Sequence, residues 1–118
     1  MDKDYSFKKL LVWQKAKELV VDIYRITDKY PKSELFGLTS QMRRAAISVA
    51  ANIVEGNSKR SKKYYLNFLN IAEASLAELD AYLEISLSLK FLKDSDCNVL
   101  FSKRKEVGYL LYRLIKSL

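Results

Sequence analysis

The chain has 118 residues, of which 49% are apolar and 30% are charged, and its formal net charge is +7. This length allows one domain, and the composition excludes both an intrinsically disordered chain and a membrane bundle. With only three glycines and one proline, the chain has few residues for tight turns, which argues against an all-β fold. It has no histidine and a single cysteine, Cys97, which excludes disulfide frameworks, zinc sites and histidine-based acid–base catalysis. We therefore expect a single all-helical domain over residues 1–118.

The first predicted helix spans about residues 9–30. Apolar side chains recur through it at spacings of three and four residues, which indicates a helix with one face on a bundle core, and Pro31 is expected to end it. After a short linker, the second helix is predicted over 39–55 with Thr39 as its N-cap. It is predicted to end at Gly56, where a left-handed C-cap residue is expected.

The third predicted helix spans about residues 61–90, with Ser61 able to cap it, and the fourth spans about 94–118, with Asp94 as an acidic N-cap. The third has a leucine-rich stripe at helical spacing, and the fourth repeats apolar residues in the same way. Short connections between four amphipathic helices favour antiparallel neighbours. The predicted fold is an all-α, antiparallel, up-down-up-down four-helix bundle.

The second helix has more apolar surface than a lone bundle needs. One of its three faces is the core face, and a second is a polar stripe formed by Gln41, Arg44, Ser48, Asn52 and Glu55. The third face is also apolar and carries Ile47, Ala50, Ala51 and Val54. A helix that is apolar on two sides is usually buried on two sides, so we predict a homo-oligomer interface here. The alternative is the ordinary scatter of apolar residues on a protein surface.

The polar stripe has two interpretations that helical periodicity does not separate. In one, Arg44 and Glu55 belong to a paired, hydrogen-bonded network that fixes neighbouring helices or subunits, with Asn52 supplying amide bonds. In the other, the stripe is simply the solvated face of the helix.

Positive charge is concentrated in the middle of the chain. Residues 39–63 carry six basic groups and one acidic group, whereas residues 64–96 carry two basic and six acidic groups. The cations predicted to contact nucleic acid are Arg43, Arg44, Lys59, Arg60, Lys62 and Lys63. No sequence-reading motif is present, so such binding would be electrostatic. The alternative is a solvated turn. A second basic group, 103–105, is expected to be a solvated helix face that can also meet the acidic third helix.

Catalytic, metal and cofactor sites are not expected. The three glycines form neither a phosphate loop nor a dinucleotide fingerprint, and the carboxylates of the third helix are scattered around it. Cys97 lacks an imidazole to activate it and is expected to be a packing residue. No run approaches the ~20 apolar residues that cross a bilayer, and the acidic N-terminus has no apolar stretch behind it. We expect a non-enzymatic, cytoplasmic protein without a membrane partner.

The segment 38–56, LTSQMRRAAISVAANIVEG, resembles the signature Gln-x-Arg-Arg-Ala…Ser-x-x-x-Asn-Ile-x-Glu-Gly of small proteins encoded in intervening sequences of bacterial 23S rRNA genes. Similar pieces lie at 11–16, 30–38 and 71–79. The resemblance implies a four-helix bundle in a ring-like homopentamer without catalytic residues. It also implies kinship with the accessory protein of diversity-generating retroelements, a basic pentamer that binds nucleic acid and a reverse transcriptase.

These observations together predict a homo-oligomeric basic bundle that binds nucleic acid; the resemblance implies that the oligomer is a pentamer, and it favours RNA. The alternative function is that of a protein–protein adaptor, in which the true ligand is a nucleic-acid enzyme such as a reverse transcriptase.

Overall fold

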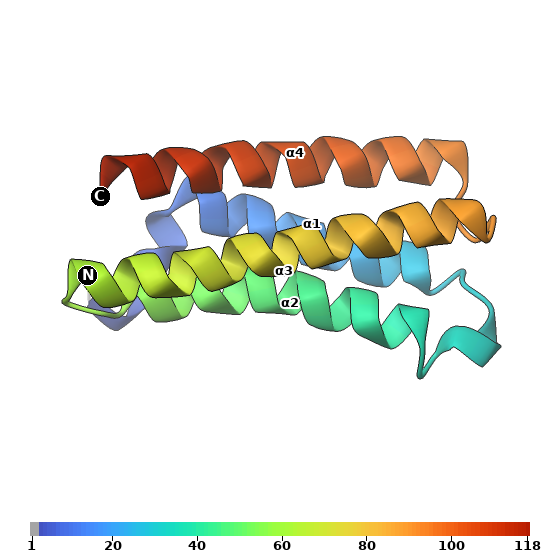
Figure 1. Ribbon diagram of the computed structural model, residues 1–118, viewed down its shortest axis with the longest axis horizontal. Helices are drawn as coiled ribbons and strands as arrows, with labels where there is room; N and C mark the ends of the chain where they lie inside the picture. The colour runs from blue at the N-terminus through green and yellow to red at the C-terminus, as the bar shows by residue number, and fades with distance from the viewer. Residues whose placement is uncertain (1–2) are drawn as a thin grey trace.

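The computed structural model describes residues 3–118, and these contain four α-helices and no strand (Figure 1). The prediction of an all-helical chain with four helices is confirmed. Met1 and Asp2, which contributed to the expectation of a missing signal peptide, lie outside the described residues. The elements in chain order are a 3-10 helix η1 (Lys3–Lys9), α1 (Leu11–Thr27), a short 3-10 helix η2 (Lys32–Glu34), α2 (Leu38–Asn57), α3 (Lys62–Ser88) and α4 (Asp94–Ser117).

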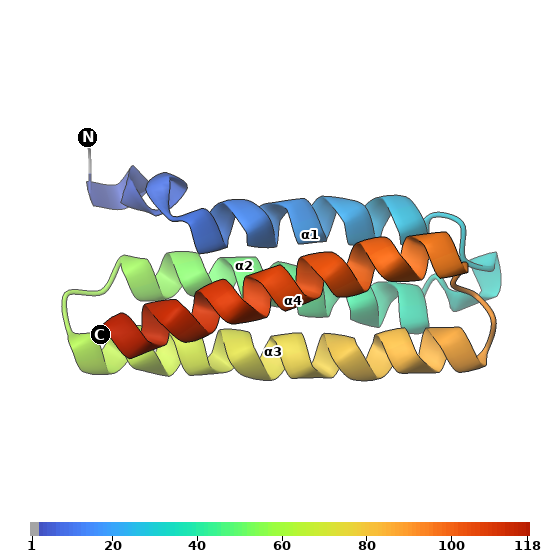
Figure 2. The same ribbon diagram turned by 90° about the horizontal axis from the view of Figure 1, so that it is seen from above.

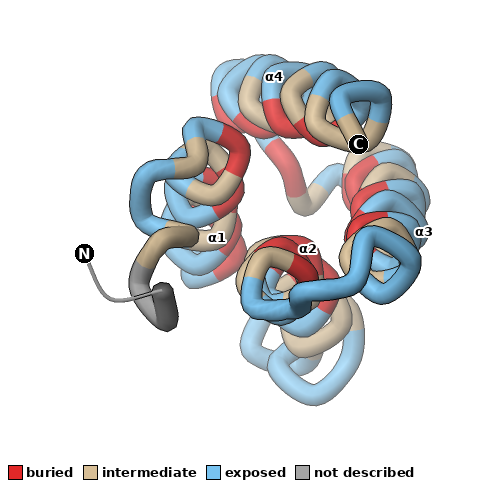
Figure 3. Tube along the Cα trace, turned by 90° about the vertical axis from the view of Figure 1, so that its left-hand side faces the viewer, coloured by how far each residue is buried: buried red, intermediate tan, exposed pale blue. Residues whose placement is uncertain are grey.

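The four α-helices lie along one long axis, and the molecule measures 43 × 23 × 22 Å (Figures 1 and 2). Viewed from the end, they occupy four corners around a common core, with α1 beside α2, α2 beside α3, and α4 closing the square (Figure 3). The buried side of every helix faces that core. This arrangement leaves each helix with one outer face and two flanks.

The relative height of α2 and α3 is fixed by two side-chain contacts. The hydroxyls of Ser48 and Ser75 lie 2.8 Å apart, and the hydroxyl of Tyr82 donates to Oε1 of Gln41 at 3.4 Å. Because the α3 residue number rises as the α2 number falls, these two helices run in opposite directions.

Apolar side chains from all four α-helices form the core. At 0% exposure it includes Leu19, Ile23, Met42, Val49, Ile53, Leu69, Leu79, Leu83, Leu100, Val107 and Leu111. Full burial of one such side chain contributes about 1.5–3 kcal/mol relative to leaving it in water. The predicted apolar stripes of the four helices therefore do supply the core.

The predicted first helix, 9–30, is longer than the helix observed. Residues up to Lys9 form a 3-10 helix, and α1 ends at Thr27. The N–H groups of Lys29 and Tyr30 then donate to carbonyls only three residues back, which closes the last turn. The residue before a proline is disfavoured in the α conformation, so the helix ends well before Pro31.

Two of the predicted N-caps are also wrong. α2 begins at Leu38, whose N–H donates to Oε1 of Glu34 at 3.2 Å, and Thr39 is buried inside the first turn. In α4 the N-cap is Lys93, so Asp94 stands one position further in. There its negative charge still lies near the positive end of the helix dipole.

Candidate nucleic-acid interface and apolar groove

The turn between α2 and α3 carries a dense group of exposed cations. This group, called the basic turn below, consists of Lys59, Arg60, Lys62 and Lys63. Ser61 occupies the N-cap position of α3 as predicted, but its side chain makes no capping hydrogen bond. The backbone N–H groups of the first turn of α3 therefore have no side-chain cap and lie among the cations, an arrangement that favours anions.

The position of the basic turn depends on a close approach between α2 and α3. Gly56, predicted to be a left-handed C-cap, is instead a buried residue within α2 without a positive φ. A Cβ atom there would lie 3.0 Å from the ring of Tyr65 and 3.2 Å from Cβ of Phe68. The left-handed residue is Lys90, after α3, with φ of 61°. The role of glycine at position 56 is therefore to let α2 and α3 approach closely, and not to adopt a left-handed backbone conformation.

Side chains also hold the turn at its base. Asn57 donates through Nδ2 to Oγ of Ser6 at 2.8 Å, and its Oδ1 accepts from the hydroxyl of Tyr65 at 3.4 Å. Burial raises the pKa of the Tyr65 hydroxyl, which keeps this group in its donating form. The base of the turn is thus packed, and its basic side chains project from it.

Most of the positive charge of the basic turn is not paired within the described residues. Lys59 lies 3.9 Å from Glu55 and 5.3 Å from the centre of the Phe68 ring. The other three cations form no ion pair with any residue of the described part of the chain. Beside them, along the exposed face of α3, is an open depression of about 680 Å³ lined by Lys62, Lys63, Tyr64, Leu66, Asn67 and Asn70.

Arg43 and Arg44 do not join this group. They lie near the opposite end of α2, about 20 Å along the helix from its last residue, at 1.5 Å per residue. Arg43 donates to Oγ1 of Thr27 at 3.0 Å and to the carbonyl of Tyr24 at 3.3 Å, with its guanidinium 4.5 Å from the centre of the Tyr24 ring. The six cations predicted as one site are therefore two separate groups, and Arg43 joins α2 to α1.

The predicted interface residues line a shallow apolar groove of about 230 Å³ between α1 and α2. We call it the α1–α2 groove; it is lined by Trp13, Lys17, Val20, Ile47, Ala50, Ala51 and Val54. Contact with α1 leaves Ala50 and Val54 half-buried, whereas Ile47 is 44% exposed and Ala51 is also exposed. α1 thus covers only part of the second apolar face of α2.

The polar stripe lies at the seam between α2 and α3. Besides the contact between Ser48 and Ser75, Asn52 donates through Nδ2 to the carbonyl of Ser48 at 2.8 Å and to its hydroxyl at 3.1 Å. Arg44 and Glu55 do not pair with each other. The seam is hydrogen-bonded within one chain, and Arg44 remains exposed beside it.

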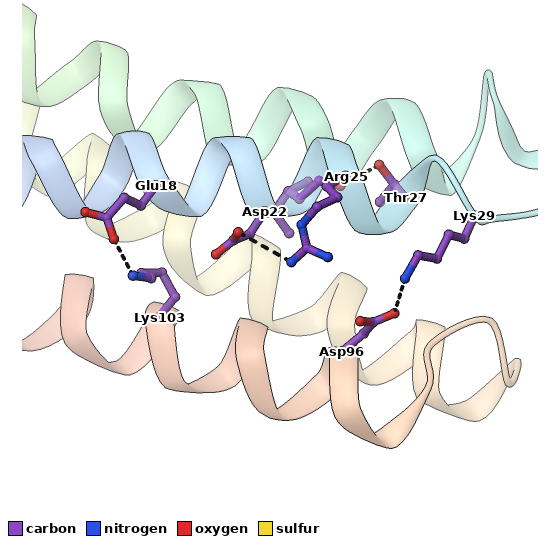
Figure 4. Close-up of polar contacts among 8 residues, drawn as sticks. Glu18, Asp22, Arg25, Thr27, Lys29, Asp96 and Lys103 are labelled. Carbon is purple, nitrogen blue, oxygen red and sulfur yellow. Dashed lines mark hydrogen bonds and ion pairs between the residues drawn. The ribbon is translucent and has the colours of Figure 1, made fainter.

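Two members of the second basic group, Lys103 and Arg104, are paired with acidic residues of the same chain. Arg104 donates to both carboxylate oxygens of Asp80 on α3 at 2.5 and 2.7 Å. Lys103 lies 2.5 Å from Glu18 on α1, a hydrogen bond that lowers the pKa of Glu18 and raises that of Lys103 (Figure 4). A contact of this group with the acidic third helix was one of the two expectations, and Arg104 makes it. The pair of Lys103 with Glu18 on α1 was not predicted, because helical periodicity does not tell which flanks meet.

The ion pairs also show how α1 and α4 run. Besides the pair between Glu18 and Lys103, Lys29 lies 3.2 Å from Asp96 (Figure 4). Lys29 lies two residues beyond the end of α1 and meets the first turn of α4, whereas Glu18 within α1 meets Lys103 further along α4, so these two helices are antiparallel.

The possible metal ligands of the described residues include Asp and Glu carboxylates and the thiol of a single cysteine, Cys97. Residues 3–118 contain no group of three or more Cys, Asp or Glu side chains placed to hold a metal ion. Burial raises the pKa of the Cys97 thiol, and Asp94 and Glu84 raise it further, so the thiolate form is disfavoured. Over the same residues, no helix has the length and apolar character needed to span a membrane.

Residues 3–118 thus form a small helical bundle with an exposed basic turn at one end and an apolar groove between α1 and α2. Residues 8–113 match the family described as 23S rRNA-intervening sequence protein. The chain therefore belongs to the 23S rRNA-intervening sequence protein family.

A solved structure supports the same assignment. The chain is similar to a protein with unknown function from the S23 ribosomal protein family of Bacteroides thetaiotaomicron VPI-5482, with 26% sequence identity and a TM-score of 0.80. The similarity covers 90% of this chain and 99% of the other. Comparison with curated proteins gives no match.

Proposed function

We propose that this protein is a non-enzymatic, cytoplasmic, homo-oligomeric bundle, pentameric and ring-like, that binds RNA electrostatically through the basic turn. Each chain is an up-down-up-down bundle in this proposal, and the α1–α2 groove is part of the contact between chains. Family membership supports the choice of RNA, since the family is described by its link to 23S rRNA genes. Five copies would bring about twenty cations together, and such multivalency strengthens binding to a polyanion.

The observation that carries the RNA proposal is the charge of the basic turn. Three of its four cations form no ion pair within the described residues, and all four are exposed at the N-terminus of a long helix. Lysines at a helix N-terminus are unfavourable for the helix itself because of its dipole. An anionic ligand at this position would offset that cost.

The first test is the salt dependence of RNA binding. For four phosphate contacts per subunit with a single strand, affinity is expected to fall about 50-fold between about 50 and 200 mM salt. A gel-shift or anisotropy titration with mixed-sequence RNA measures this slope. A flat salt response would contradict an electrostatic interface.

The second test reverses the four cations of the basic turn to Glu, which is expected to abolish RNA binding. A matched control reverses four exposed lysines elsewhere and so has the same net charge: Lys32, Lys90, Lys93 and Lys105. If binding depends on local charge, the control retains much more affinity than the basic-turn variant. Equal losses in the two variants would show that only net charge matters.

The assembly is tested by placing a charge in the α1–α2 groove. Ile47→Glu or Ala51→Glu is expected to break the oligomer while leaving the helical content unchanged, because a carboxylate would be desolvated in the contact. Val99→Glu on α4, where Val99 is 40% exposed, is the matched control. Light scattering after size-exclusion chromatography gives the mass of each variant. A wild-type protein that is monomeric at micromolar concentration would refute the assembly.

One observation favours the adaptor function as a second candidate. Tyr109 and Tyr112 on α4 are 59% and 52% exposed, and exposed tyrosines are frequent anchors of protein partners. In the adaptor case no polyanion binds at low salt, and a partner such as a reverse transcriptase is lost when both tyrosines are changed to Ala. Co-purification with the candidate partner measures that loss.

A further inference from the structure

We propose that the α1–α2 groove of one chain takes the outer face of α3 from a second copy, so that the subunit contact joins two different surfaces. This inference rests on the proposed homo-oligomer and deepens it by naming the surface that fills the groove. A contact between two different surfaces closes into a ring when its rotation permits, whereas a self-complementary contact ends at a dimer.

The groove is apolar and positively charged. Lys17 lies 5.4 Å from the centre of the Trp13 ring at one end, and Arg43 lies over Tyr24 beyond the other end. No acidic residue lines the groove. Its complement should therefore be an apolar ridge with negative charge.

The outer face of α3 has this character. We call it the α3 ridge; it consists of Ile71, Ala74, Glu78, Ala81 and Ile85. The alternating spacing of three and four residues places them on one side of the helix, away from the core. Ile71 and Ile85 are 41% and 46% exposed, and Glu78 is also exposed. The ridge therefore combines two uncovered isoleucines with one central carboxylate.

Heights along the bundle axis place the first part of the α3 ridge, Ile71 and Ala74, beside the groove. In a closed ring whose axis follows the bundle, copies are related by rotation without translation, so contacting residues must have equal heights. The contact between Ser48 and Ser75 puts these residues at one height in each chain. Counting along the antiparallel helices from there, Ile71 reaches the height of Asn52, next to Ala51 in the groove.

The same counting places the charges opposite each other. Glu78 reaches the height of Ala45, which is two residues, or about 3 Å, from Arg43. The Glu78 carboxylate of one copy thus lies near Arg43 of the next copy, just beyond the end of the groove. Ile71 of the first copy then enters the apolar part of that groove. Apolar fit and opposite charge occur together in one register.

The angle between the two surfaces is compatible with a small ring. In a square bundle the α2–α3 face is about 90° from the α1–α2 face, and the outer corner of α3 is about 135° from it. The α3 ridge, exposed and turned from the core, is taken to lie between these two directions. Rings with contact surfaces at those angles contain about four to eight members, a range that includes five. α2 then faces the ring axis and α4 the outside, so the basic turns of all copies gather at one mouth of the ring.

Disulfide trapping between separate chains tests the pairing, in a Cys97→Ser background. Chains with Ala51→Cys and differently tagged chains with Ile71→Cys, co-expressed and oxidised, should form a covalent heterodimer. When either variant is oxidised without the other, no covalent dimer should form. The matched control replaces Ile71→Cys by Ala77→Cys, an exposed position on another side of α3, and should form at least about fivefold less heterodimer. Covalent dimers of the Ala51→Cys chain alone would show a groove-to-groove contact and overturn the proposal.

A charge reversal provides an independent readout. Glu78→Arg should raise the dissociation constant of the oligomer at least about tenfold, because like charges then face each other. Glu84→Arg, on another side of α3, should leave it nearly unchanged. Circular dichroism checks that each variant is folded.

The outcomes separate this inference from the proposed function. A wild-type monomer would refute both. A different result would be an oligomer that Ile47→Glu breaks, while Ile71→Cys forms no heterodimer with Ala51→Cys and Glu78→Arg does not weaken the assembly. That result would show that the α3 ridge does not fill the groove, and it would leave the proposed homo-oligomer unaffected.

Discussion

Replacing Gly56 by alanine tests whether the α2–α3 contact depends on the missing side chain. Gly56 lies inside α2 without a positive φ, so alanine is compatible with the backbone there and should gain about 1 kcal/mol of helix propensity. Against this, the added Cβ would lie 3.2 Å from both the Tyr65 carbonyl oxygen and Cβ of Phe68, and 3.0 Å from Cδ1 of Tyr65. Two of these three atoms belong to or adjoin the backbone, so the helices must separate.

The balance of these two effects gives the expected magnitude. Overpacking by one methyl group at a rigid contact costs about 1–3 kcal/mol. With the gain in propensity deducted, Gly56→Ala should lower the free energy of unfolding by about 1 kcal/mol. For a domain of this size that corresponds to a fall in Tm of about 4 °C. Because Gly56 adjoins the basic turn, RNA affinity should weaken as well.

The matched control is Gly108→Ala on α4. A Cβ there would lie 2.7 Å from Nη1 of Arg104, the end of a flexible side chain, and at an ordinary 3.5 Å from Leu76. Gly108→Ala should therefore be neutral or mildly stabilising. Thermal and urea unfolding of both variants measure the difference. An increase in stability for Gly56→Ala equal to that of Gly108→Ala would refute the close-contact argument.

Two further predictions concern the ion pairs between helices. The pKa of Glu18 is lowered by its hydrogen bond with Lys103, so this pair stabilises the fold above the ordinary carboxyl pKa and stops doing so as the pH falls through the lowered value. Glu18→Gln should therefore make the free energy of unfolding, measured with urea, depend less steeply on pH in the acid range. An unchanged pH dependence would contradict the pair. Asp80→Asn removes the partly exposed carboxylate to which Arg104 donates two hydrogen bonds, and it should lower the free energy of unfolding by about 1 kcal/mol. In urea unfolding, the midpoint should fall while the dependence of the free energy on urea concentration stays the same.

Helical periodicity was sufficient to identify the four helices and most of the core. Each helix has an apolar stripe at spacings of three and four residues, and burial of such a stripe is what stabilises a helix in a protein. Helix ends were less predictable. The side chain of Glu34, four residues from Leu38 in sequence, meets the start of α2, and α1 ends three residues before Tyr30. These ends depend on local hydrogen bonds that several residue types can supply.

The exposure of the basic turn could be predicted from the sequence, whereas the position of Arg43 could not. Closely spaced cations between two helices predict an exposed turn, because burying unpaired charges is energetically costly. Arg43 was misplaced because its charge suggests a surface ligand, whereas in the structure it lies on the ring of Tyr24 and bonds to Thr27. A contact between residues 16 or more positions apart leaves no mark in the periodicity of either helix.

The order of apolar and polar residues along 118 positions was enough to specify four amphipathic helices, a surplus apolar face on the second and a cluster of positive charge after it. Such properties are local, since they depend on residues within a turn or two of one another. Three-dimensional packing settled which flanks meet: α1 covers part of the surplus face, Gly56 brings the ends of α2 and α3 together, and Lys103 and Arg104 are paired with acidic residues of the same chain. Those outcomes depend on the rotation and height of one helix against another, which side chains distant in the sequence fix jointly.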